Sequence, residues 1–413
     1  MRLTHFLRVI LTLFVCSGTL FSAGFDNRFL PWYPRVAPRT VSKRSFARVD
    51  SFFLTGNSAY GDASTERKGI PELWGTFDLR LLALASETVG NANRLRPAWQ
   101  DVIDINWNVY GKVQGQGITF AGEYSLTDHL SFGGSTTFLH VTSNQKFVLP
   151  RATATSLLLT ASDELEIDED RRQTLKDLGF ADAKWAESSL ADSEFYIRYG
   201  WMQEYRVKCR QAGFGLVLGA LLPSSKQRDM TNPAAIPFGG QHMSGIYCGA
   251  DAIFEVKEDI WFNLMVKLSK RFSKIQKRRL PVKGEPEIFG ATTGNVKIDP
   301  GETILFSPAL GFDNIREGLG LQMQYVFATH AGDVWTDKRA DTAITLALSK
   351  VNKLSKWKSE YVLFNVSYDL GKVSDEQKVR PLINFFADFP IKLLKRRDVA
   401  KTQRVGLSVE FRF

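Results

Sequence analysis

The chain of 413 residues is long enough for one large barrel domain or for two globular domains. Its 53 Lys and Arg exceed its 44 Asp and Glu, and its three Cys are too few for a disulfide scaffold. No zinc-binding spacing, phosphate loop or nucleotide motif occurs, so we expect no cofactor, no metal ion and no nucleic-acid partner.

The first residues predict a secretory signal peptide. Arg2 and Arg8 give a positive start, an apolar stretch follows, and small residues precede a cleavage site after Gly24. Cleavage after Ala23 and an uncleaved membrane anchor are the alternatives, although Arg8 leaves the apolar run short for a membrane span. We therefore divide the chain into a signal peptide, a periplasmic N-terminal segment and a barrel domain, with the bounds 1–24, 25–43 and 44–413.

Beyond residue 43 apolar and polar residues alternate, which is the period of a β-strand with two different faces. The longest apolar run there, 213–222, is too short to cross a membrane as a helix. The segment 75–84 alternates weakly, and its Leu and Ala residues also suit a helix. The clearly alternating segments are 44–56, 101–113, 117–126, 130–141, 194–207, 212–222, 246–256, 260–272, 303–312, 320–329, 360–370, 381–389 and 402–413.

The lengths of the connections between these segments favour a membrane barrel over a β-sandwich. Counted back from the C-terminus, short connections fall on one side and long ones on the other, and a sandwich gives no reason for this sorting. Aromatics make up 12% of the chain although its mean hydropathy is slightly negative, as expected when lipid-facing and lumen-facing residues average out. The long connections are 142–193, 223–243, 273–302, 331–358 and 390–401.

We therefore expect an all-β fold, a transmembrane antiparallel up-and-down β-barrel with short periplasmic turns and long extracellular loops. A chain that starts and ends in the periplasm needs an even number of strands. Counting the segment 75–84 gives fourteen strands, and twelve is the alternative.

The longest connection contains an acidic stretch, at 163–190, that predicts an extracellular helical insertion. Leu175 and Leu178 have helical spacing, and Gly179 is placed to end the helix. The acidic residues do not have the spacing of a calcium-binding loop. The insertion either folds over the barrel mouth or is a solvated surface helix.

The last strand carries its apolar residues on one parity, and it extends to the final residue. With the signal peptide and the hairpin at 122–134, it resembles the strands of Gram-negative outer-membrane β-barrel proteins. The resemblance covers the architecture of nearly the whole mature chain and implies a location in the cell outer membrane. It also implies that the terminal strand is the signal that the barrel-assembly machinery reads. The residues of this assembly signal are Val405, Leu407, Val409, Phe411 and Phe413.

The polar parity of the strands predicts the lining of a water-filled lumen. Positive and negative side chains nearly balance there, so the whole-chain charge of +9 does not imply an anion channel. We expect passive diffusion of small solutes with weak ion selectivity. The predicted lumen-lining residues are Lys112, Arg198, Arg206, Lys267, Arg271 and Arg404, together with Asp104, Glu123, Glu204, Asp251, Glu255, Asp369 and Glu410.

Two other functional classes stay open: a structural or adhesive barrel without an open pore, and an outer-membrane barrel hydrolase. His140 and His330 lie near the extracellular ends of predicted strands, where a barrel enzyme builds its site. Neither belongs to a recognisable catalytic pattern, so we expect no enzyme. The oligomeric state is left as monomer or trimer.

The surplus positive charge is concentrated in three extracellular segments, 274–283, 349–358 and 392–401. Arg and Lys suit the phosphates of lipopolysaccharide, and Trp357 and Phe389 supply interfacial aromatics nearby. We therefore expect a basic collar that contacts lipopolysaccharide, consisting of Lys277, Arg278, Arg279, Arg396 and Arg397.

Overall fold

The computed structural model describes residues 26–33, 35, 45–61, 67–100, 105–180, 183–204, 209–285, 290–373, 380–394 and 396–413. The predicted signal peptide lies outside the described residues. Two predicted lumen-lining residues, Asp104 and Arg206, also lie outside them.

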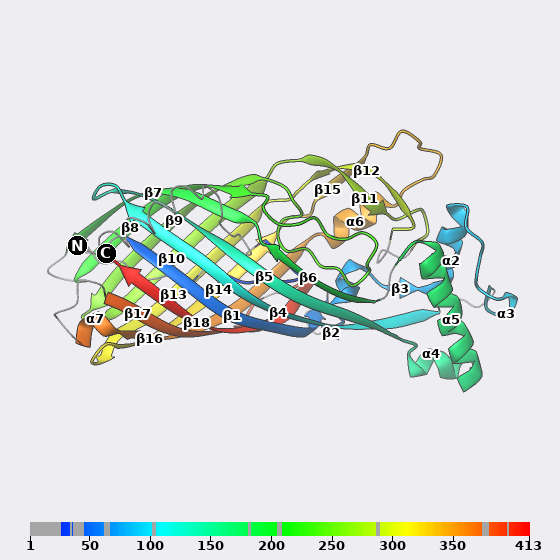
Figure 1. The fold of residues 1–413 in the computed structure, drawn as a ribbon, viewed down its shortest axis with the longest axis horizontal. Helices are drawn as coiled ribbons and strands as arrows, with labels where there is room; N and C mark the ends of the chain where they lie inside the picture. Colours follow the sequence, from blue (N-terminus) through cyan, green and yellow to red (C-terminus); the bar gives the residue numbers. More distant parts are fainter. Residues whose placement is uncertain are drawn as a thin grey trace, which may run out of the picture.

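Twelve antiparallel strands form a closed barrel (Figure 1). The ring closes because β1 pairs with β18 on one side and with β4 on the other. Closure leaves no unpaired strand edge, which is the condition for a sheet to cross lipid. The strands are β1 (Phe46–Tyr60), β4 (Asn106–Ser125), β5 (Leu130–Val148), β7 (Ser193–Glu204), β8 (Gln211–Leu222), β9 (Gly245–Lys257), β10 (Ile260–Arg271), β13 (Thr303–Arg316), β14 (Leu319–His330), β16 (Trp357–Asp369), β17 (Arg380–Pro390) and β18 (Val399–Arg412).

The prediction of fourteen strands is wrong, and the alternative of twelve is correct. The described parts of the segments 101–113 and 117–126 form one strand, β4 (Asn106–Ser125), because the glycines between them do not form a turn. Gly117 leaves room for Phe52 and Leu139, whose side-chain atoms lie 2.7 Å from the position that a Cβ would occupy. Glycine there allows close packing inside a long strand.

The weakly alternating segment 75–84 is the second error in the strand count. It forms only a two-residue strand, β3 (Phe77–Asp78), before helix α2 (Leu79–Thr88) begins. The Asp78 side chain accepts a hydrogen bond from the Leu81 backbone N–H at 3.1 Å, which is an N-terminal helix cap. The helix buries Leu79, Leu82 and Ala83 on one face. The apolar residues of this segment therefore follow the period of a helix and not that of a strand.

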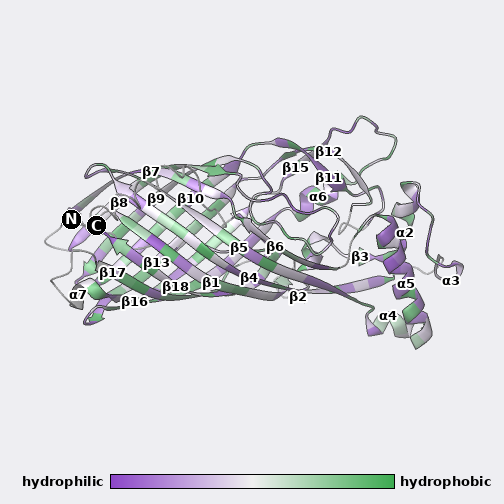
Figure 2. Cartoon of the chain, viewed as in Figure 1, coloured by the Kyte–Doolittle hydropathy of each residue, from purple (hydrophilic) through white to green (hydrophobic). Residues whose placement is uncertain are grey.

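The outer surface of the barrel is apolar. On β18, the five predicted assembly-signal residues all point outward and are between 38% and 58% exposed. Between them, inward-facing side chains such as Thr402, Arg404 and Glu410 are buried. Figure 2 shows apolar residues along the barrel strands, whereas helix α5 is mostly hydrophilic. An apolar exterior with a polar and charged interior is the arrangement of a barrel in lipid.

The connections sort by length between the two ends of the barrel (Figure 1). One end, here called the turn end, carries the C-terminus and the short connections, including helix α7 (Leu370–Val373). The other end, the loop end, carries all remaining elements. These are β2 (Arg67–Lys68), the short helix η1 (Pro71–Trp74), β3, α2, α3 (Pro97–Gln100), α4 (Arg151–Ser156), α5 (Ala161–Asp177), β6 (Lys184–Leu190), β11 (Lys274–Leu280), β12 (Thr292–Asp299), β15 (Val334–Asp337) and α6 (Leu348–Leu354).

The expected helical insertion at 163–190 is helical in its first half only. Helix α5 starts at a capping box, in which Thr160 and Asp163 bond each other's backbone N–H groups. Its buried Ile167 and Leu175 pack in a cluster with Leu82 of α2. The second half forms β6, which pairs with β5 and extends the barrel wall. Among the described residues, no helix is both long and apolar enough to cross a membrane.

Candidate functional site

An N-terminal segment, residues 26–35, lies inside the barrel along the inner face of β18. The Arg28 carbonyl accepts from the Ala400 N–H at 2.9 Å, and the Tyr33 carbonyl accepts from the Arg404 guanidinium at 3.1 Å. These contacts place the described part of the segment in the lumen, whereas the sequence predicts a periplasmic location for 25–43. Of that range, residues 25, 34 and 36–44 lie outside the description.

The segment is held in the lumen by buried apolar side chains. Phe29, Leu30, Trp32 and Tyr33 are all buried, and Trp32 packs against Phe52 of β1 at 6.4 Å between ring centroids. Burying a side chain of this size stabilises by about 1.5–3 kcal/mol. Four such side chains within five residues make this a packed plug.

Two ion pairs fasten the ends of the same segment. Near the loop end, Asp26 accepts from Arg271 of β10 at 2.5 Å, and Arg271 also donates to Asp192 at 2.8 Å. Farther along, Arg35 pairs with Asp50 of β1 at 2.5 Å. All five side chains are largely withdrawn from solvent, so breaking either contact leaves a charge without its partner in the interior.

The lumen wall carries further charges, and they occur mostly as pairs. Arg198 of β7 pairs with Asp251 of β9 at 2.6 Å. Lys267 of β10 pairs with Glu194 of β7 at 2.5 Å. These parts of the interior therefore contain many charged side chains, but their positive and negative charges nearly cancel.

Most predicted lumen-lining residues are on the inward parity of their strands. Glu204 also has this parity, but it is exposed at the turn end of β7. Lys112 is exposed on the outward parity of β4, contrary to its predicted place. The inward residues are Glu123, Arg198, Asp251, Glu255, Lys267, Arg271, Asp369, Arg404 and Glu410.

The prediction for Lys112 is wrong because, near the loop end, the apolar residues of β4 face the interior and not the lipid. Trp107 and Val109 face inward and are buried in a cluster with α2 and α5, so their apolar parity is not a lipid-facing one. Glu194 and Asp388 also face the lumen without having been predicted, although both lie on inward parities that alternation alone could have identified.

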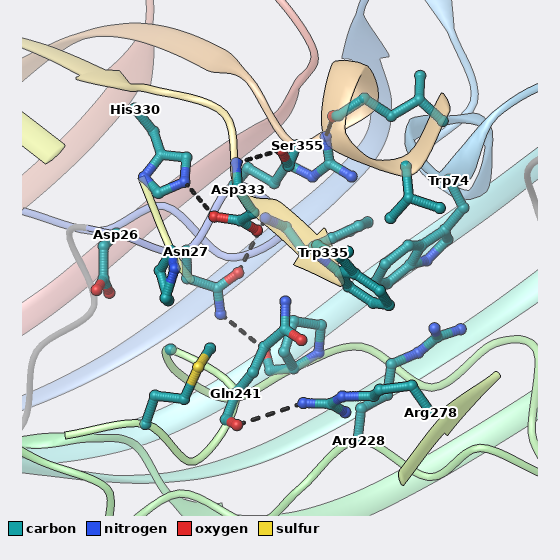
Figure 3. A pocket seen from close by; sticks show the side chains of 18 of the residues that line it. Asp26, Asn27, Trp74, Arg228, Gln241, Arg278, His330, Asp333, Trp335 and Ser355 are labelled. Carbon is teal, nitrogen blue, oxygen red and sulfur yellow. Dashed lines mark hydrogen bonds and ion pairs between the residues drawn. The ribbon is translucent and has the colours of Figure 1, made fainter. Parts of the chain in front are cut away.

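The N-terminal segment borders a cavity of about 160 Å³, here called the loop-end cavity. Its wall comes from residues 26–29, from Trp74 of η1, from the β8–β9 connection, from β11 and from the region around β15 and α6. Figure 3 shows His330 and Asp333 on one side, with Arg228, Gln241 and Arg278 across the cavity from them. Trp74 and Trp335 also line this cavity.

Guanidinium groups dominate the charge of this cavity. Arg228 stacks on Trp74, with its Cζ 3.9 Å from the ring centroid, and Arg279 stacks on Phe180 at 3.7 Å. Arg278 donates to the Gln241 carbonyl at 3.3 Å and to the Gln276 side chain at 2.5 Å. These partners are neutral, so they orient the guanidinium groups without cancelling their charge.

His330 belongs to a hydrogen-bonded chain that has the order of a hydroxyl, a base and an acid. Thr303 Oγ1 lies 2.8 Å from His330 Nδ1, and His330 Nε2 lies 3.0 Å from Asp333 Oδ1. Thr303 is only 2% exposed and does not line the cavity, so its hydroxyl has no access to a substrate there. The geometry gives no support to the hydrolase alternative at this place.

A second cavity, of about 190 Å³, lies in the lumen toward the turn end. Arg35 of the N-terminal segment lines it, together with inward residues of the wall such as Tyr196, Tyr247 and Lys267. The N-terminal segment thus contributes its first residues to one cavity and its last described residue to the other. Among the described residues, no group of His, Cys, Asp or Glu side chains could hold a metal ion.

The five residues of the expected lipopolysaccharide collar differ in their surroundings. Lys277 is exposed, and Arg397 is partly exposed beside Asp398 at 3.1 Å. Arg278 and Arg279 face the loop-end cavity, and Arg396 is buried with its Cζ 3.8 Å from the Tyr60 ring centroid. Contact with lipopolysaccharide stays a prediction for this set.

No protein-family model and no curated protein matches the chain. Among solved structures, an outer-membrane channel from Pseudomonas putida F1 is similar at 10% identity and a TM-score of 0.47, covering 92% of this chain and 100% of that one. A Pseudomonas aeruginosa FadL homologue is similar at 10% identity and a TM-score of 0.34, covering 95% of both chains. The transport unit of the autotransporter AIDA-I from Escherichia coli is similar at 5% identity and a TM-score of 0.37, covering 94% of this chain and 95% of that one.

These TM-scores lie below 0.5, so nothing about substrate or transport follows from them for this chain. The closed ring of strands and its apolar exterior are features of the chain itself. They make it an outer-membrane β-barrel located in the cell outer membrane, as the resemblance of the terminal strand predicts.

Proposed function

We propose that the chain is an outer-membrane channel for passive diffusion of small solutes, and that its N-terminal segment closes the lumen in the state described. The turn end would face the periplasm and the loop end the exterior, which is the usual orientation of such barrels. Lipopolysaccharide and the barrel-assembly machinery would be its partners, and it would act as a monomer or trimer without enzymatic activity.

The observation that carries this proposal is the position of the N-terminal segment between two cavities. Residues 26–29 line the loop-end cavity and Arg35 lines the second cavity, while the buried side chains of Leu30, Trp32 and Tyr33 fill the space along β18 between them. A barrel with a purely structural role has no need of cavities on both sides of a removable plug. Displacing one short segment would join the two.

The paired charges of the wall support weak ion selectivity in the open state. Arg198 with Asp251 and Lys267 with Glu194 present both signs to any path along the lumen. Along this part of the lumen, which is lined by neutral pairs, neither ion is strongly favoured. The arginines of the loop-end cavity would favour anions, so the salt-gradient measurement decides between weak selectivity and anion selectivity.

Planar-bilayer recording of the purified full-length protein tests the proposal. Wild type should show little steady conductance, whereas the double variant Leu30→Ala, Trp32→Ala should conduct because the segment loses much of its buried area. Leu165→Ala is the matched control, since Leu165 is an exposed apolar residue on α5. A reversal potential near zero under a salt gradient would agree with weak selectivity.

Different outcomes separate the competing functions. A folded double variant that stays silent at all voltages would favour the structural or adhesive barrel. Hydrolysis of a lipid or peptide ester by the purified wild type would favour the enzyme.

A further inference from the structure

Four arginines around the loop-end cavity have no carboxylate partner among the described residues. Arg28 donates to the backbone carbonyls of Leu73 and Leu354, and Arg228 donates to that of Ala235 at 2.7 Å. Arg278 bonds only neutral groups, and Arg279 donates to carbonyls that include Met230 O at 2.6 Å. Arg271 of the same lining differs, because it is neutralised by Asp26 and Asp192. The one remaining lining carboxylate, that of Asp333, contacts His330. Asp333 attracts Arg28 and Asp229 attracts Arg228 through space, but neither forms an ion pair with these arginines.

Gathering unpaired cations in a partly dry space is unfavourable in the empty protein. Burial, and to a smaller extent the nearby charge of Arg278, lowers the pKa of Arg228 to about 9, with Asp229 acting in the opposite direction. Burial alone lowers the pKa of Arg278 to about 10. Both groups stay charged at neutral pH, so an anion between them would relieve the repulsion and restore the lost solvation.

Two buried donors around the cavity lack an acceptor. Arg278 is 6% exposed, and its Nε has no hydrogen-bond partner. The indole Nε1 of Trp335 is also buried without a partner, and both side chains line the cavity. Because both side chains line the cavity, a ligand there could accept from them. Unpartnered indole N–H groups also occur away from the cavity, at Trp107 and Trp261.

The rest of the wall suits an apolar body. Phe29, Trp74, Phe180, Met230 and Met243 line the same space. The cavity volume of about 160 Å³ resembles the roughly 150 Å³ of an engineered apolar cavity that binds benzene. A free inorganic anion would leave these aromatic and thioether surfaces without a contact.

We infer that the loop-end cavity binds a small organic carboxylate about the size of benzoate. Its carboxylate accepts hydrogen bonds from Arg228 and Arg278, whose planar guanidinium groups match the two oxygens. Its apolar body lies against other apolar lining residues such as Trp335 and Met243, because the Trp74 ring is already stacked by Phe29 and Arg228. That this carboxylate is transported would rest on the proposed channel function. That it binds in the loop-end cavity does not depend on that function.

Titration calorimetry of the detergent-solubilised full chain tests the inference with three probes: benzoate, the neutral benzyl alcohol and inorganic phosphate. Benzoate should bind at least tenfold more tightly than either of the others. If benzyl alcohol binds as tightly as benzoate, the negative charge of the ligand does not contribute to binding. If phosphate binds as tightly as benzoate, the apolar body of the ligand does not contribute. Either result overturns the inference.

The variant pair Arg228→Gln, Arg278→Gln should weaken benzoate binding at least tenfold. Arg172→Gln is the matched control, because Arg172 is an exposed arginine of α5 outside the cavity, and it should bind as wild type does. Unchanged affinity in the double variant would refute the site.

If the double variant does not fold, Trp335→Phe gives an independent test. It keeps an aromatic ring and removes only the N–H donor, so benzoate affinity should fall at least threefold. Unchanged affinity would count against the site. Calorimetry needs no transport, so failure of this inference and failure of the channel proposal are seen in different experiments.

Discussion

Replacing Arg271 by Met should release the N-terminal segment from the lumen. Arg271 holds Asp26 at 2.5 Å and Asp192 at 2.8 Å, and its side chain is 5% exposed. Met keeps much of the side-chain volume but leaves two buried carboxylates without their cation. Removing one partner of a buried ion pair typically costs about 3–5 kcal/mol.

This cost acts mainly on the segment, because the two carboxylates differ in their other contacts. Asp192 still accepts from the backbone N–H groups of Ser225 at 3.2 Å and Gly240 at 2.6 Å. Asp26 keeps no comparable partner in the interior, and one of its oxygens is already unsatisfied. Asp26 regains its solvation only when the segment leaves. Since about 1.4 kcal/mol is a factor of ten, the detached fraction should rise by roughly two to three orders of magnitude.

Single-channel recording measures this directly as the fraction of time spent open. Arg198→Met is the matched control, since it breaks the Arg198–Asp251 pair of the barrel wall at 2.6 Å without touching the segment. We expect at least a hundredfold rise in open fraction for Arg271→Met and little change for the control. If both variants open equally, or if neither does, the ion pair is not what retains the segment.

Two further predictions concern the terminal strand and the three-stranded sheet of β11, β12 and β15, here called the loop-end sheet. Burial raises the pKa of Glu285, in the connection between β11 and β12, from its ordinary value of 4.5 to about 8, so this carboxyl is still protonated at neutral pH in the folded protein. The sheet should therefore lose stability as pH rises from about 4.5 through 8, by at most about 5 kcal/mol. Hydrogen exchange of β11 and β12 should show this pH dependence in wild type and lose it in Glu285→Gln; identical profiles would exclude Glu285 as the cause. Phe413→Ala should lower the amount of protein in the outer membrane several-fold, because Phe413 ends the outward apolar row, whereas Arg412→Ala should not. Immunoblots of membrane fractions measure both, and equal levels would contradict an assembly role for Phe413.

Alternation along the chain was sufficient to predict a membrane barrel. The two-residue period comes from the backbone of each strand, so it is visible in the sequence without knowledge of its neighbours. Val405, Leu407, Val409, Phe411 and Phe413 face outward because of that local geometry. Glu123 and Arg198 face inward for the same reason. The barrel type and the location in the outer membrane follow from the same pattern.

The strand count depended on contacts that the sequence does not display. The glycines around 111–117 resemble a turn, but they permit Phe52 and Leu139 to pack closely against a continuous strand. At 75–84, burial of one helical face against distant residues such as Ile167 outweighs a weak alternation. Both results depend on side chains far away in the chain.

The candidate site was decided by tertiary structure alone. Nothing local in residues 26–35 shows that they enter the lumen, because the residues that bury them come from β1, β10, β16 and β18. Arg28, Arg228 and Arg278 come from three distant parts of the chain, and as sequence they are ordinary loop cations. Folding brings them to one cavity whose two lining carboxylates, Asp26 and Asp333, already contact Arg271 and His330. Charge balance is set by which side chains meet in space and not by composition.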